Sequence, residues 1–225
     1  MSKPMTPLVA PPPVGRPLRS ALLLALVALA PSLAAAQTGV RLDSAAWRAM
    51  NVFLSAFVEA EILPFERGAV PHATLVQFAV MHHVFNSPER IGRVPGRPGY
   101  GRLRASDVAA AAATYFGVRP GRHRAPDGAW IEYADGYYVF PDGDRDGRSF
   151  AQVGRVVEVA GGDLVADVGI YWLLEWGADV YATPVEDLRR AGFEVSDHVT
   201  RRARVRRVGG GARERYVLLE YLEGP

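Results

Sequence analysis

Residues 150–176 decide the fold class, and they read FAQVGRVVEVAGGDLVADVGIYWLLEW. Within Phe150–Ala160 and again within Asp163–Trp176, apolar and polar residues alternate over much of the run, which is the period of a half-buried β-strand. Gly161-Gly162 separates the two runs, and a two-residue glycine turn is typical of antiparallel strands. The stretch therefore predicts a long β-hairpin.

Two more hairpins are predicted, one on each side of this stretch. Trp130–Ala134 and Tyr137–Phe140 flank Asp135-Gly136, a strong hairpin turn that places Tyr133 opposite Tyr138. The last hairpin joins residues 199–208 to residues 213–222 through three consecutive glycines. The second half of the chain is therefore expected to form about six antiparallel strands.

The first half of the chain has a helical period instead. Three helices are predicted, over residues 43–61, 72–86 and 107–116. In the second helix His82 is expected to point inward, because it shares a face with Phe78 and Phe85. A further short helix is expected to begin with Thr183 as its N-cap and Glu186 at the third position. Helices followed by hairpins predict an α+β fold, with three N-terminal helices packed on one face of a curved antiparallel sheet of about six strands built from three hairpins.

The first 36 residues have the pattern of a secretory signal peptide. Lys3, Arg16 and Arg19 precede an uncharged stretch of 16 residues, and Ala34-Ala35-Ala36 forms a small-residue exit. A membrane-spanning helix needs about 20 apolar residues, so this stretch is too short to be a retained anchor. We predict cleavage between Ala36 and Gln37, a single domain over residues 37–225, no transmembrane span after cleavage, and a secreted or extracytoplasmic location.

Removal of that segment changes the charge of the chain. The full sequence of 225 residues has a net charge of +2, and loss of one lysine and two arginines leaves 23 basic residues against 24 acidic ones. Nucleic acid is therefore not an expected partner, because the net positive field that would attract it is gone. The absence of cysteine suits an oxidising compartment, since nothing in the chain can form a disulfide.

No standard catalytic motif occurs in the sequence, so the catalytic hypothesis depends on one histidine. His82 is a candidate general base if a carboxylate, Glu59 or Glu61, lies beside it. The alternative interpretation is a neutral core histidine satisfied by one hydrogen bond.

Two charged segments are candidate binding sites. The last hairpin has Arg202, Arg204 and Arg206 on one strand and Arg213 and Arg215 on the other, a set that could hold an anionic component of the cell envelope. The same alternation is also typical of a solvated outer face that prevents edge pairing.

A calcium ion is the only cofactor that the sequence suggests. Asp142, Asp144 and Asp146 alternate before Gly147, as do the first ligands of a calcium loop, but Val153 stands where the closing acid would be. The alternative is a polar turn between two strands.

Several short segments together resemble uncharacterised small exported proteins and lipoproteins of Gram-positive bacteria. Residues 51–59 read NVFLSAFVE, residues 75–79 read LVQFA and are followed by His82 and Asn86, and residues 136–141 read GYYVFP. The resemblance implies an exported envelope protein, and it assigns no activity. The order of helices and hairpins also fits a cystatin-like or NTF2-like cone by analogy.

These observations favour an exported, non-catalytic protein of the cell envelope that binds an unknown small ligand or an anionic partner. The alternative is a small NTF2-like pocket enzyme that uses His82 with a nearby carboxylate.

Overall fold

The computed structural model describes residues 38–128, 130–143, 148–174, 177–210 and 214–224, all of which belong to the unit Ala34–Pro225. The described part of the chain is an α+β fold with antiparallel sheets, which confirms the predicted class. The single six-stranded sheet is wrong, however, because the described strands form two sheets of five and four strands.

The five-stranded sheet contains the last two predicted hairpins. It has the strand order β1-β6-β7-β8-β9, with neighbouring strands antiparallel. The long hairpin is β6 (Arg148–Glu158) with β7 (Leu164–Leu173), joined through Gly161 and Gly162, both of which have positive φ. The strands β8 (Val195–Val208) and β9 (Arg215–Glu223) follow, and the short β1 (Thr38–Gly39) pairs with the end of β6.

The remaining hairpin belongs to a separate four-stranded sheet in the order β2-β3-β5-β4. Its strands are β2 (Gly92–Arg93), β3 (Tyr100–Arg104), β4 (Glu132–Ala134) and β5 (Tyr137–Pro141). Tyr133 lies opposite Tyr138, as the Asp135-Gly136 turn predicts. The sequence prediction missed β3 within an Arg- and Gly-rich segment, and β3 pairs with β5 along its whole length, which removes this hairpin from the larger sheet.

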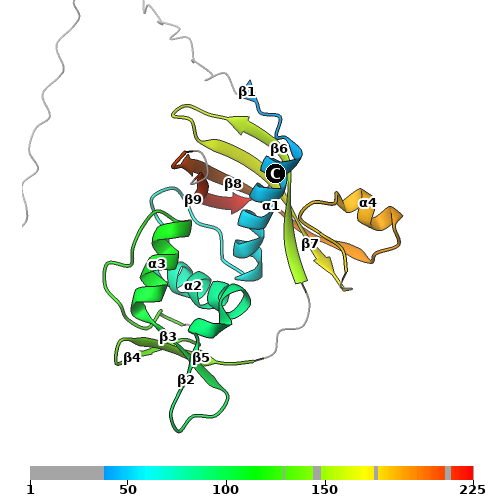
Figure 1. The fold of residues 1–225 in the computed structure, drawn as a ribbon. Helices are drawn as coiled ribbons and strands as arrows, with labels where there is room; N and C mark the ends of the chain where they lie inside the picture. The colour runs from blue at the N-terminus through cyan, green and yellow to red at the C-terminus, as the bar shows by residue number, and fades with distance from the viewer. Residues whose placement is uncertain (1–37, 129, 144–147, 175–176, 211–213, 225) are drawn as a thin grey trace, which may run out of the picture. The chain divides into compact units, whose positions relative to one another are not determined.

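Four α-helices pack on these sheets in the described structure: α1 (Ser44–Glu59), α2 (His72–Asn86), α3 (Ala105–Tyr115) and α4 (Val185–Arg190). A short 3-10 helix, η1 (Pro88–Arg90), follows α2. Figure 1 shows α1 beside β6 of the larger sheet and α2 and α3 beside the smaller one. Asp43 caps α1 by accepting from the Ala46 amide, as expected, whereas α4 begins after Pro184 without a side-chain cap, so the predicted Thr183 cap is wrong.

The helix α2 lies between two hydrophobic cores, and this corrects the predicted orientation of its side chains. Leu75, Phe78 and Met81 contribute to the core beneath the larger sheet, whereas Val76 and Val80 contribute to the core of the smaller sheet. A helix that is buried on two sides has no single inward face. On α2 the buried histidine is therefore His83, which donates from Nδ1 to the Ala79 carbonyl over 2.7 Å, while Phe85 is 41% exposed.

Polar side chains of α1 hold this helix against β6. The Asn51 side chain is completely buried, accepts a hydrogen bond from the Val153 amide over 2.9 Å, and donates to the Tyr181 carbonyl over 2.9 Å. One turn further on, Ser55 accepts from the Ala151 amide over 2.8 Å. These contacts pair backbone groups of β6 that lie beyond its short pairing with β1, since an unpaired buried amide is costly.

Replacement of Asn51 tests how much this attachment contributes. Asn51→Ala leaves the Val153 amide and the Tyr181 carbonyl without their partner, and we expect the free energy of unfolding to fall by about 2–4 kcal/mol. Urea unfolding followed by circular dichroism measures it. The control is Glu89→Ala at an exposed position just after α2, which should change stability by less than about 0.5 kcal/mol. Equal effects of the two variants would contradict the interpretation.

Candidate functional site

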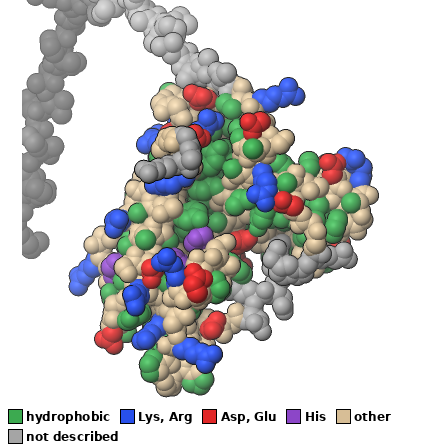
Figure 2. Space-filling model, viewed as in Figure 1, with side chains coloured by type: hydrophobic (Ala, Val, Ile, Leu, Met, Phe, Trp, Pro, Cys, Tyr) green, Lys and Arg blue, Asp and Glu red, His purple; other side chains and the backbone are tan. Residues whose placement is uncertain are grey.

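A pocket of about 580 Å³ lies between the three larger helices, the start of β9 and the segment that precedes α4. We call it the helix–hairpin pocket. Its apolar and aromatic wall is formed by Val52, Phe53, Tyr115, Tyr181 and Tyr216, and its polar groups come from Glu59, His82, Asn86, Thr114, Glu214 and Arg215. Figure 2 shows hydrophobic side chains gathered over α1 on the face in view. The volume and the mixture of an apolar wall with few polar groups are typical of small-molecule sites.

His82 lines this pocket, as the catalytic alternative requires, and it is held by rings on both sides. Its imidazole stacks on Phe78 with ring centroids 5.6 Å apart, and the Tyr115 ring centroid is 4.6 Å away. Its Nδ1 lies 3.3 Å from Nδ2 of Asn86. Because an amide nitrogen only donates, Nδ1 accepts this hydrogen bond and the proton of the neutral ring lies on Nε2.

The surroundings of His82 favour its neutral form. Burial, with a smaller contribution from the neighbouring His83, lowers the pKa of His82 from 6.5 to about 4. A partly buried imidazole loses hydration when it becomes charged, which is why its pKa falls. At neutral pH the ring is therefore a neutral hydrogen-bonding group and a weak base.

Glu59 places a carboxylate at the same pocket. Its Oε1 accepts a hydrogen bond from the Tyr181 hydroxyl over 3.2 Å. Burial and the negative charge of Glu59 raise the pKa of Tyr115, so that tyrosine keeps its proton. Three residues that are far apart in sequence thus meet here, and sequence reasoning identified only one of them, because Tyr181 and Tyr115 occur in no recognisable motif.

The two carboxylates that were paired with His82 in the sequence hypothesis have different positions. Glu59 lines the pocket, whereas Glu61 is exposed beyond the end of α1 and does not line it. Glu61 has a positive φ of 50°, and its backbone carbonyl accepts from the Gln77 side chain. The backbone reversal at the end of α1 therefore separates Glu61 from the pocket.

The arginines of the last hairpin lie beside acids of neighbouring strands. Arg202 pairs with Asp167 over 3.2 Å, and Arg206 donates to Asp163 over 2.8 Å. Arg204 also faces Asp163, at 3.2 Å. Arg215 instead donates to the Thr114 carbonyl at the helix–hairpin pocket. Arg202, Arg204 and Arg206 share the face of β8 opposite the buried Ala203 and Val205, and Arg213 lies outside the described residues, so an anion-binding role of the five arginines stays a prediction.

Asp163, just before β7, is shared by three arginines. Its side chain is 1% exposed and lies within 3.2 Å of Arg67, Arg204 and Arg206. Burial opposes its ionisation, but the hydrogen bond from Arg206 and the charges of the three arginines outweigh burial, so the pKa of Asp163 lies below its usual value. Three cations around one carboxylate leave an excess of positive charge.

The suggested calcium loop stays a prediction. Asp142 is exposed just after β5, and Asp144 and Asp146 lie outside the described residues. Among the residues that the structure does describe, no three His, Asp or Glu side chains are grouped closely enough to hold a metal ion.

Comparison with known proteins assigns no family to this arrangement. No protein-family model matches the chain, and neither the curated proteins nor the solved structures contain a significant match. Within the described residues, no helix has the length and apolar character needed to cross a membrane.

The low pKa of His82 predicts a specific pH dependence of stability. The unfolded chain binds the proton near pH 6.5 and the folded chain only near pH 4, so stability is lost as the pH falls between these values. Because the side chain is partly solvated, we expect the wild type to lose about 1–2 kcal/mol more than His82→Gln across this window. Chemical unfolding at several pH values measures the difference, and parallel profiles of the two proteins would be inconsistent with it.

Proposed function

We propose that the helix–hairpin pocket binds a small organic molecule with an apolar or aromatic body and a positively charged or hydrogen-donating end. The observation that carries this proposal is the position of the Glu59 carboxylate within a wall of aromatic rings. Organic cations are bound in this way elsewhere, since aromatic faces attract positive charge and a carboxylate adds to the attraction.

The geometry of the rings supports a preformed site. Phe53 stacks on Tyr115 with centroids 6.0 Å apart, and it contacts Tyr216 at 5.6 Å. Tyr181 is held by the hydrogen bond of its hydroxyl to Glu59 and by that of its backbone carbonyl to Asn51. Rings that are already ordered lose little conformational entropy when a ligand binds between them.

The charges at the pocket support the same ligand class. Glu59 and Glu214 contribute two negative charges, whereas Arg215 contributes one positive charge and donates to the Thr114 carbonyl. The balance favours a cation over an anion at this site.

Binding is favoured over catalysis by the state of His82. The enzyme alternative needs a histidine whose pKa is close to the working pH, and a pKa of about 4 makes a poor general base at neutral pH. The causes of that low pKa are burial and His83, and the hydrogen bond on its Nδ1 comes from Asn86, not from a carboxylate. His82 is better suited to hydrogen-bond a ligand.

Three probes of similar shape test the ligand class: phenethylamine, 2-phenylethanol and 3-phenylpropionate. We expect the amine to bind most tightly and the carboxylate least, because only the amine complements both Glu59 and the aromatic wall. Glu59→Gln should weaken amine binding by about five- to tenfold and change alcohol binding little. Isothermal titration calorimetry measures all three.

The matched control for this test is Glu66→Gln, an exposed glutamate away from the pocket, which should bind the amine like the wild type. Equal affinity for all three probes, or an equal loss in both variants, would overturn the proposed ligand class.

We also propose that the chain is exported and loses residues 1–36. Expression of the full sequence in a bacterial host should yield an extracytoplasmic protein whose mass corresponds to a chain beginning at Gln37. Ala36→Arg should block processing, because the peptidase requires a small residue at the exit. Mass spectrometry of the extracytoplasmic fraction checks both results, and an exported wild type that retains residues 1–36 would refute this cleavage.

A further inference from the structure

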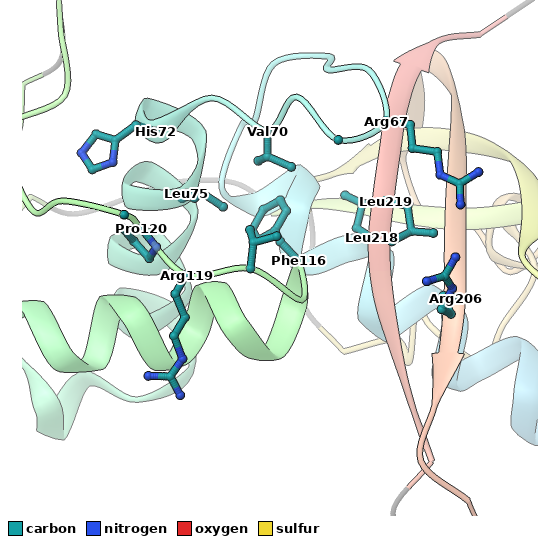
Figure 3. A pocket seen from close by; sticks show the side chains of 13 residues that line it. Arg67, Val70, His72, Leu75, Phe116, Arg119, Pro120, Arg206, Leu218 and Leu219 are labelled. Carbon is teal, nitrogen blue, oxygen red and sulfur yellow. The ribbon is translucent and has the colours of Figure 1, made fainter.

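A second pocket of about 420 Å³ is lined by the segment that precedes α2, the first turn of α2, the segment that follows α3, and the strands β8 and β9. We call it the arginine pocket, and Figure 3 shows it from close by. Arg67 and Arg206 lie on the hairpin side, His72 and Arg119 lie on the helix side, and Phe116 is between them.

The centre of the arginine pocket is apolar and rigid. Leu75, Phe116 and Leu218 line it, and each of them is at most 5% exposed. Phe116 packs edge-on against Phe78 with ring centroids 5.1 Å apart. This floor can therefore bury part of a hydrocarbon group without a change in the core.

The charged groups that line this pocket are all basic. Arg67 and Arg206 share the buried Asp163 with Arg204, which also lies 4.0 Å from Glu220. Three guanidiniums against two carboxylates leave one positive charge. The carboxylate of Asp163 is thus shared by more cations than it can neutralise.

Arg119 adds a second positive charge. It is exposed and has no hydrogen-bond or ion-pair partner within the described part of the chain, so its guanidinium can turn to a ligand without breaking an existing contact. The N-terminus of α2 is at the same pocket, because His72 and Leu75 belong to its first turn, and α2 has no side-chain cap there. The positive end of a helix dipole favours a nearby anion.

We propose that the arginine pocket binds a soluble single-chain amphiphilic anion, with its carboxylate, sulfate or phosphate group on the helix side near Arg119 and its hydrocarbon chain on Phe116, toward the positively charged hairpin side. An apolar floor between basic side chains complements both parts of such a molecule, and the volume lies within the range of roughly 300–1,000 Å³ for small-ligand sites. This site is separate from the helix–hairpin pocket and takes ligands of the opposite charge.

Octanoate below its micelle concentration is the probe that tests this site, with 1-octanol and inorganic phosphate as comparisons. We expect saturable 1:1 binding of octanoate that weakens with added salt, and weaker binding of the alcohol and of phosphate. Arg119→Gln should reduce octanoate affinity by about tenfold or somewhat less, since it removes a charge-assisted hydrogen bond. Arg67→Gln should reduce it by a smaller factor, because it removes a positive charge from the opposite side of the pocket. Val118→Asp, which places a negative charge on an exposed residue of the lining, should reduce it as well.

Arg93→Gln is the matched control, because Arg93 is also exposed and lies in the smaller sheet away from the pocket. It should leave octanoate binding within twofold of the wild type. If 1-octanol bound as tightly as octanoate, the proposed role of the anionic group would be overturned. If inorganic phosphate bound as tightly as octanoate, the proposed role of the apolar floor would be overturned. If the protein bound phosphatidylglycerol vesicles but not monomeric octanoate, the proposal of a soluble ligand would be overturned, and a membrane lipid would be indicated instead.

The two ligand sites are distinguishable in the same experiments. Glu59→Gln should not change octanoate binding, and Arg119→Gln should not change phenethylamine binding. If amine binding fails while octanoate binds as described, the proposed function is wrong and the arginine pocket stands. If octanoate binding is lost in both Arg119→Gln and Glu59→Gln, the assignment to the arginine pocket is wrong.

Discussion

The hydrogen bonds between α1 and β6 are the constraint on which the rest of the structure depends. The strand β1 pairs with only two residues of β6, so the backbone of residues 151–153 needs other partners on that edge. Ser55 and Asn51 accept from the amides of Ala151 and Val153, and the indole of Trp47 donates to the Val153 carbonyl over 2.9 Å. A buried edge must be paired in this way because water cannot reach it. The register of α1 on the sheet is therefore fixed by polar contacts as well as by packing.

This register also builds the helix–hairpin pocket. Asn51 holds the Tyr181 carbonyl with the same side chain that pairs with β6, and Glu59 lies about two turns further along α1. From the other side of β6, Gln152 holds the same segment by donating to the carbonyls of Val180 and Thr183, and it accepts from the Val185 amide. The segment that carries Tyr181 is thus bound at both ends, although it belongs to no helix or strand.

Local patterns predicted the elements well and their assembly less well. The Asp135-Gly136 turn predicted the pairing of Tyr133 with Tyr138, because the turn type alone sets this register. The second sheet was missed because β3, the strand that pairs with β5, lies in an Arg- and Gly-rich segment whose pairing partner is distant in the sequence.

The site was predicted only in part. Glu59 and His82 were identified by residue type, but Tyr181 and Tyr216 reach the pocket through tertiary contacts that have no sequence pattern. His82 packs on Phe78 as predicted, but Phe85 of the same predicted face is exposed and His83 is buried, because α2 is buried on two sides and one sequence period cannot describe two faces.

The end of α3 and the start of β9 lie between the helix–hairpin pocket and the arginine pocket, and each contributes residues to both. Tyr115 lines the helix–hairpin pocket and the next residue, Phe116, lines the arginine pocket. The strand β9 also contributes to both pockets, because Tyr216 lines the helix–hairpin pocket and Leu218 lines the arginine pocket. Between them lies a packed aromatic wall, in which Phe57 contacts both Tyr115 and Phe116 with centroids 6.0 Å and 5.3 Å apart. Because this packed wall lies between the two pockets, the two proposed sites can carry opposite charge although they share one sheet and one helix end.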